Sequence, residues 1–178
     1  MLTGDRIILR ARMDADVAIL HAELHDDVDT FVRANAAAWR PQPAGRPESP
    51  FAIPDTPKPD SALFSVVLSA DGHLAGAASV WGLDQHNRLA HLGLSLLPAF
   101  RGQGLGSDIV RVLCDYGFRV LGLHRLQIET LADNAAMRSV AERCGFQVEG
   151  IQRQAAWVLG RYVDEVIYGR LSPFALPR

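Results

Sequence analysis

The segment Arg101–Gly106, with the sequence RGQGLG, constrains the fold of this chain more than any other segment. It follows an apolar run that ends at Pro98, and it opens a stretch with helical periodicity. Glycines let successive backbone N–H groups turn toward one point, because no Cβ atom blocks the approach of a ligand. A following helix would aim its free N–H groups and its positive dipole end at the same point. We therefore predict a strand, an anion-binding loop and a helix in succession.

Three kinds of glycine-rich loop bind phosphate groups in this way. A nucleotide-hydrolysing P-loop needs a Lys followed by Ser or Thr after its last glycine, but Gly106 is followed by Ser107 and Asp108. A dinucleotide-binding loop has the pattern Gly-x-Gly-x-x-Gly and an acidic residue at the end of the next strand. The glycines here follow Gly-x-Gly-x-Gly, although Glu129 does end the next apolar run, so this alternative stays open. The third pattern, Arg-x-x-Gly-x-Gly, resembles the coenzyme A pyrophosphate loop of the GCN5-related N-acetyltransferase (GNAT) superfamily.

Other segments carry the same resemblance. Residues 134–146, an Asn-led helix that ends in Gly-Phe, are similar to the second motif of that superfamily. Residues 2–10 resemble the opening strand of its ribosomal-protein N-terminal acetyltransferase branch, and Glu149-Gly150, Gly160 and Asp164 resemble that branch's terminal hairpin. The resemblance spans nearly the whole chain. It implies an α/β acyl-CoA N-acyltransferase fold with a mixed, twisted sheet of about six to seven strands, splayed near the coenzyme.

The resemblance also implies a coenzyme site for acetyl-CoA. In that family the loop backbone, here Gln103 to Gly106, binds the pyrophosphate, and the strand before it offers backbone groups to the pantetheine arm. Asn134 stands where the family's asparagine contacts that arm, although an ordinary helix N-cap explains this residue equally well. Arg138 is a further candidate, and it or Arg153 would suit a longer acyl group such as succinyl. The expected coenzyme-binding residues are Leu94, Leu96, Leu97, Arg101, Gly102, Gln103, Gly104, Leu105, Gly106, Asn134 and Arg138.

The acid and the base are less well defined than the coenzyme loop. Many family members place a tyrosine seven residues after the motif asparagine to protonate the thiolate, but Ala141 stands there. The related branch often has a serine three residues after it, where this chain has Met137. Three catalytic candidates remain, each with a structural alternative. Ser139 would serve as the acid or be an ordinary helix serine, His91 would be the base or a strand histidine, and Glu129 would be the base or a loop-orienting carboxylate.

Composition restricts the classes of partner. The chain has 178 residues and a formal charge of −2, which suits a single domain over residues 1–178 and argues against a nucleic-acid surface. No apolar stretch has the length of a membrane span and no secretory segment opens the chain, so we expect a cytoplasmic protein. Cys114 and Cys144 lack metal-ligand spacing and should be reduced, buried thiols, with no metal site expected. A homodimer through the carboxyl-terminal hairpin is the remaining expectation on partners.

Periodicity and turn residues predict the elements around the loop. Asp14 begins an amphipathic helix, a second helix carries Val28 and Phe31, and seven prolines between residues 41 and 59 exclude regular structure there. A glycine turn at Asp71-Gly72 joins two antiparallel strands. Strands are expected at 7–12, 62–69, 74–81, 89–97, 125–131, 148–159 and 162–171, with helices at 105–120 and 134–144. The strand at 125–131 should run parallel to its predecessor, since a helix connects them.

These inferences predict an N-acetyltransferase that moves acetyl from acetyl-CoA to a primary amine in a ternary complex. The acceptor is either a protein N-terminus or a small amine, and an acidic acceptor site would favour polycations. Two alternatives from other classes remain. One is a non-catalytic acyl-CoA sensor, because both familiar acid positions are apolar. The other is a nicotinamide dinucleotide oxidoreductase, which would need Glu129 on a ribose and a larger parallel sheet.

Overall fold

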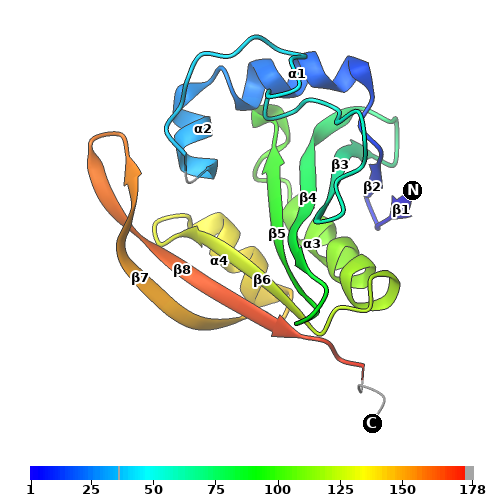
Figure 1. Cartoon of the computed structure of the whole chain (residues 1–178), viewed down its shortest axis with the longest axis vertical. Helices are drawn as coiled ribbons and strands as arrows, with labels where there is room; N and C mark the ends of the chain where they lie inside the picture. Colours follow the sequence, from blue (N-terminus) through cyan, green and yellow to red (C-terminus); the bar gives the residue numbers. More distant parts are fainter. Residues whose placement is uncertain (36, 175–178) are drawn as a thin grey trace.

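A computed structural model describes residues 1–35 and 37–174 of the chain, and its centre is one eight-stranded sheet (Figure 1). The strand order is β1-β2-β3-β4-β5-β6-β8-β7. All neighbouring strands are antiparallel except β5 and β6, which are parallel. The strands are β1 (Leu2–Thr3), β2 (Ile7–Arg10), β3 (Ser61–Leu68), β4 (Leu74–Asp84), β5 (Leu89–Leu96), β6 (Arg125–Leu131), β7 (Gln147–Val158) and β8 (Arg161–Leu171).

This architecture confirms the predicted α/β class and the mixed sheet. The seven strands expected from the sequence are present, and the two-residue strand β1 adds an eighth. A run as short as Leu2–Thr3 has no periodicity of its own, so only its pairing with Leu9 and Ile8 identifies it as a strand. A sheet with a single parallel pair is not the larger parallel sheet that a dinucleotide fold needs, so the oxidoreductase alternative fails.

Helices lie on both faces of the sheet (Figure 1). On one face, α3 (Leu105–Asp115), its π-helical continuation Tyr116–Val120 and α4 (Ala135–Arg143) bury the main core. On the other face, α1 (Asp14–Leu24) packs Leu20 and Leu24 against Ala77 of β4, and α2 (Val28–Ala34) follows it. The main core includes the fully buried Ile7, Leu9, Val66, Val80, Ala90, Leu105, Ile109, Leu113, Leu126, Ile128 and Tyr168.

Polar side chains near the helix N-termini bind free backbone N–H groups. The helix α1 begins at Asp14, as expected, and its N-cap is Met13, whose N–H donates to the Asp16 carboxylate. Asp27 caps α2 through Thr30 N–H, and Asn134 caps α4 through Met137 N–H. The proline-rich residues 41–59 form turns without a helix or strand, as predicted.

The sheet opens between β5 and β6, in agreement with the splay that the family resemblance implied. Their parallel ladder has three residue pairs and ends at His91 opposite Gln127, although β5 continues to Leu96 and β6 to Leu131. Beyond His91 the two strands therefore diverge, and the facing backbone of β5 has no strand partner. Two further findings concern the same described residues: no helix has the length and hydropathy to span a membrane, and Cys114 and Cys144 are free, buried thiols, as expected.

Candidate functional site: a glycine loop beside an open sheet

The glycine loop has the backbone geometry of an anion cradle. Gly102 and Gly104 adopt left-handed φ angles of +73° and +78°, which side chains with a Cβ rarely adopt. A Cβ built on either glycine would meet no atom within 4 Å, so the loop is open on that side. Gly104 is the N-cap of α3, and the free N–H groups of the first helical turn follow directly. Backbone dipoles at this point favour an anion such as a phosphate.

The one acidic residue in the first turn of α3 is turned to other partners. Asp108 is buried, and its carboxylate accepts from the N–H groups of Asp5 and Arg6 at 3.1 and 2.8 Å. Burial alone would raise the pKa of Asp108, but these hydrogen bonds and Arg111 outweigh it and hold the pKa below its ordinary value. Asp108 therefore ties the β1–β2 turn to α3.

Arg101 does not reach into the cradle. Its Nε donates to the carbonyl of Leu96 at 3.0 Å, and its Nη2 donates to Thr30 Oγ1 on α2 at 3.2 Å. Arg6 Nη1 donates to Gln103 O at 2.8 Å, and so a second arginine, which the sequence did not single out, holds the loop backbone. Arg101, which the family resemblance placed among the coenzyme-binding residues, therefore links the loop to α2.

The end of β5 presents free backbone groups to the opening. Leu97 N–H donates to Ala75 O on β4, so the Leu97 amide is not available to a ligand. The backbone N–H and C=O groups of successive residues in a strand point alternately to its two neighbouring strands. Leu96, Leu94 and Leu92 therefore direct these groups away from β4, to the side where β6 has diverged. Arg101 occupies the Leu96 carbonyl, which leaves Leu94 as the predicted residue with the least committed backbone.

Asn134 and Arg138 both have defined structural partners. The Asn134 side-chain oxygen accepts from Met137 N–H at 3.1 Å, so Asn134 is the N-cap of α4, which is the structural alternative given for this residue. Its amide NH₂ has no hydrogen bond among the described residues. Arg138 donates to Ala132 O at 3.0 Å and to the buried Tyr168 hydroxyl at 3.3 Å. Close helix packing places α4 beside the loop, because a Cβ on Gly106 would lie 3.1 Å from Val140 Cγ2.

A second group of polar residues lies on β5 and β6, where these two strands begin to diverge. His91 stacks on Trp81 at a centroid distance of 4.3 Å, and its Nδ1 lies 3.6 Å from Glu129 Oε1. Gln127 Nε2 donates to the same Glu129 oxygen at 2.7 Å. Cross-strand pairing puts these side chains on one face, because His91 pairs with both Trp81 and Gln127. The structure thus brings His91 and Glu129 together, as two adjacent groups that could share a proton.

Glu165 on β8 belongs to the same group, and the sequence reasoning missed it. Glu165 pairs with Leu131, which lies two residues after Glu129 on β6 and therefore faces the same side of the sheet. Glu165 and Glu129 thus lie on the same face, on neighbouring strands. Burial, and secondarily the charge of Glu129, raise the pKa of the Glu165 carboxyl. Only the register of β8 on β6 reveals this neighbour, since the two residues are far apart in sequence.

Ser139, the third catalytic candidate, lies apart from this group. It is on α4, across the sheet from His91, and its hydroxyl accepts from Arg143 Nη2 at 2.8 Å. Arg143 Nε also donates to Ser139 O, so the pair forms a local i,i+4 contact on the helix. This geometry supports the structural alternative for Ser139.

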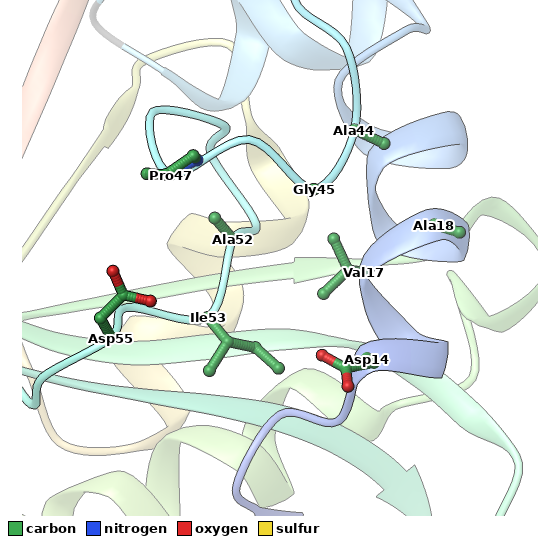
Figure 2. Close-up of a pocket in the computed structure, with 9 residues that line it drawn as sticks. All are labelled: Asp14, Val17, Ala18, Ala44, Gly45, Pro47, Ala52, Ile53 and Asp55. Carbon is green, nitrogen blue, oxygen red and sulfur yellow. The ribbon is translucent and has the colours of Figure 1, made fainter.

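Two further features involve α1 and α2. Asp133 accepts from Arg33 of α2 at 2.7 Å and from Arg161 of β8 at 2.9 Å, which holds α2 against the β6–α4 turn and the terminal hairpin. A cavity of about 340 Å³ lies between α1 and residues 44–55, and Asp14 and Asp55 are the acidic residues that line it (Figure 2). None of the site residues predicted from the sequence lines that cavity.

Comparisons with known proteins identify acetyltransferases as relatives of this chain. The chain is 39% identical over 105 residues to the putative ribosomal N-acetyltransferase YdaF of Bacillus subtilis, covering 59% of this chain and 57% of that protein. It is 28% identical over 100 residues to the spermidine N(1)-acetyltransferase of Escherichia coli, covering 56% of this chain and 54% of that protein. The chain thus matches less than two thirds of the length of these curated relatives.

A solved structure matches over a longer span. The spermidine N-acetyltransferase of Vibrio cholerae, in complex with CoA and spermine, superposes with a TM-score of 0.77 at 20% identity, covering 95% of this chain and 97% of that chain. At that identity the match supports the fold. The sequence profile of the acetyltransferase (GNAT) domain matches residues 6–147. With its glycine loop, its diverging strands and a profile match over most of its length, this chain belongs to the GNAT acetyltransferase family.

Proposed function

We propose that this protein is an acetyl-CoA-dependent N-acetyltransferase that acts on a primary amine by direct transfer in a ternary complex. One observation carries the proposal: the Gly102–Gly104 cradle at the α3 N-terminus lies at the end of β5, where β5 and β6 diverge. The cradle suits the pyrophosphate of acetyl-CoA. The free backbone of Leu94 suits the arm and the acyl carbonyl, whose developing negative charge an N–H group would stabilise. The named activities of its relatives point to the same class.

His91 is the base in this proposal. The acceptor nitrogen loses a proton and attacks the acetyl carbon, the carbon–sulfur bond breaks, and the thiolate leaves and takes up a proton. His91 Nε2 is the ring nitrogen that can receive the amine's proton, directly or through water, because Nδ1 is buried and faces Glu129. Glu129 would stabilise the imidazolium, as a carboxylate does for a neighbouring histidine. No side chain is assigned as the acid, since Ser139 is held by Arg143.

The acceptor in this proposal carries a positive charge in addition to the reacting amine. Glu129 and Glu165 place two carboxylates on the acceptor face. Two neighbouring carboxylates attract a cation and lower the cost of bringing an ammonium group into the opening. A diamine or polyamine meets this requirement, whereas a neutral N-terminal peptide does not.

Two measurements test these assignments. The first is CoA release from acetyl-CoA with a panel of diamines, monoamines and peptides. We expect diamines to be the better substrates, and Glu165→Gln to raise KM for a diamine several-fold more than for a monoamine. An equal effect on both would refute the acidic acceptor site, and no turnover of any amine despite coenzyme binding would favour the non-catalytic sensor.

The second measurement is the pH profile of kcat/KM for His91→Asn. We expect kcat/KM to fall about 10²- to 10⁴-fold, as is typical when a general base is removed. The limb of the pH profile that reports the ionisation of that base should also disappear. His86→Asn, in the exposed β4–β5 turn, is the matched control and should leave the profile unchanged. An unaltered profile in His91→Asn would remove histidine from the mechanism.

A further inference from the structure

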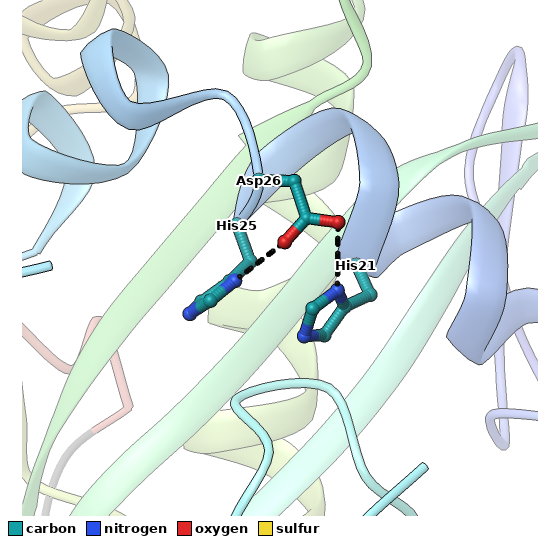
Figure 3. Close-up of side chains that lie close together, drawn as sticks. All are labelled: His21, His25 and Asp26. Carbon is teal, nitrogen blue, oxygen red and sulfur yellow. Dashed lines mark hydrogen bonds and ion pairs between the residues drawn. The ribbon is translucent and has the colours of Figure 1, made fainter. Parts of the chain in front are cut away.

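Two histidines and an aspartate converge where α1 passes into α2. His21 lies in the last turn of α1, His25 is its C-cap residue, and Asp26 follows (Figure 3). The His25 Nδ1 lies 3.0 Å from Asp26 Oδ1, and the His21 Nδ1 lies 3.3 Å from Asp26 Oδ2. The two ring centroids lie 4.4 Å apart, with the ring planes tilted by 35°. Each histidine thus faces one oxygen of the Asp26 carboxylate, and the three side chains offer ligand atoms that all lie within 4.8 Å of one another.

The rings are held in place by backbone bonds and packing. The N–H groups of His25 and Asp26 both donate to His21 O, which fixes the turn between them. Trp39 Nε1 donates to His25 O at 2.8 Å, and Phe31 packs edge-on to the His25 ring at 5.1 Å. The site is therefore built by α1, α2 and the segment that follows α2.

Neither ring is committed to another polar group. His21 and His25 are 2% and 1% exposed, and Asp26 is the one side chain that meets their ring nitrogens within the described residues. The His21 Nε2 is buried without a hydrogen-bond partner there. Buried imidazoles usually have a second partner that fixes their tautomer. The Asp26 side chain, by contrast, is 56% exposed, so the cluster is open to solvent on that side.

This donor set is one that a divalent transition metal prefers. Imidazole nitrogens and a carboxylate oxygen bind Zn²⁺ at about 2.0–2.1 Å, and two such ligands on a tetrahedral ion lie about 3.3 Å apart. The two observed nitrogen–oxygen distances, one to each oxygen of the Asp26 carboxylate, are of this size, and one ligand atom from each of the three side chains lies within 4.8 Å of the others. We propose that His21, His25 and Asp26 bind one divalent first-row transition metal ion such as Zn²⁺, with water at the open position.

The location gives such an ion a structural role. Asp27, directly after the cluster, is the N-cap of α2, and α2 carries Thr30 and Arg33. Those two residues contact Arg101 of the glycine loop and Asp133 before α4. A bound ion would fix the junction that orients α2 on the loop. The proposal concerns binding alone and does not depend on the acetyltransferase assignment.

The test uses untagged full-length protein, freed of metal with a chelator and titrated with Zn²⁺ by calorimetry. We expect one ion per chain, and a rise in melting temperature because the ion binds the folded state. Co²⁺ in place of Zn²⁺ should show the visible absorption bands of a low-symmetry site with nitrogen ligands. His21→Asn and His25→Asn should each abolish the calorimetric binding of Zn²⁺ and the Co²⁺ absorption bands.

Controls separate a metal site from a hydrogen-bonded cluster. Asp26→Asn changes an exposed carboxylate, so it keeps the fold even where a buried histidine variant does not, and it should weaken Zn²⁺ binding at least tenfold. His73→Asn is the matched control, because His73 also pairs with an aspartate, Asp71, at 2.8 Å but is exposed and has no third ligand. It should bind Zn²⁺ as the wild type does. No Zn²⁺ binding by the wild type, or equal binding by Asp26→Asn, would overturn the proposal.

Discussion

Replacing Asp16 with alanine should destabilise the fold more than any other single change to a polar side chain near α1. The Asp16 carboxylate is buried and accepts two hydrogen bonds from Arg10, at 2.6 and 2.8 Å. It also accepts from Met13 N–H at 2.9 Å and from the buried Ser65 hydroxyl at 2.8 Å. One residue therefore joins β2, β3 and the N-terminus of α1.

The expected cost follows from what Asp16→Ala leaves behind. Removing one partner of a buried ion pair costs about 3–5 kcal/mol, because the other charge stays buried and unpaired. The Arg10 side chain is 17% exposed and can reach water, so the lower end applies, about 3 kcal/mol. For a chain of this size that is a fall in melting temperature of roughly 6–12 °C.

The effect of Asp16 should also depend on pH. Burial alone would raise the pKa of Asp16, but the hydrogen bonds from Arg10, Met13 and Ser65 outweigh it and hold the pKa below its ordinary value. Such a carboxyl stabilises the fold above its unfolded pKa of about 3.9, and the contribution is lost as the pH falls through the lower, folded value. The difference between wild type and Asp16→Ala should therefore be constant near neutrality and shrink below about pH 4.

Urea unfolding followed by circular dichroism measures this difference. The midpoint should fall while the slope with urea stays the same. Asp115→Ala is the matched control, since Asp115 forms an exposed ion pair with Arg119, and it should cost less than about 1 kcal/mol. A loss below about 1 kcal/mol for Asp16→Ala, or one equal to the control, would refute the reasoning.

Three further predictions concern the packing around the coenzyme loop. Gly106→Ala should cost about 1 kcal/mol or more in urea unfolding, since the added Cβ would lie 3.1 Å from Val140 Cγ2. Tyr168→Phe should cost about 1 kcal/mol in the same assay, because the buried hydroxyl bonds to two side chains. Burial raises the pKa of Cys114 to about 11 and also raises that of Cys144, so a thiol reagent at pH 8 should label neither in native protein and both in urea. Rapid native labelling would contradict that burial.

Local patterns in the sequence were sufficient to predict the glycine loop and the helices beside it. Glycine spacing, the apolar stripe of α3 and the Asn134 cap are all set by neighbours along the chain, and the structure has the loop, helix and cap where they were expected. The opening between β5 and β6 followed from the family resemblance, and the short ladder that ends at His91 confirms it.

Long-range contacts account for what the sequence did not predict. Glu165 joins Glu129 only through the register of β8 on β6, and Arg101 turns to Thr30, 71 residues away along the chain. The pairing of Asp16 with Ser65 likewise spans 49 residues. Periodicity identifies the elements but not which polar side chains face each other across them.

The most direct test of the account is calorimetric titration with acetyl-CoA and, separately, with NADH. Wild-type protein should bind acetyl-CoA and not NADH. Gly104→Glu places a side chain and a negative charge in the cradle at φ +78° and should abolish binding, whereas Gly72→Glu imposes the same strain at φ +74° in the β3–β4 turn and should not. Binding of NADH instead, or equal acetyl-CoA binding by both variants, would contradict the assignment of this loop as the coenzyme site.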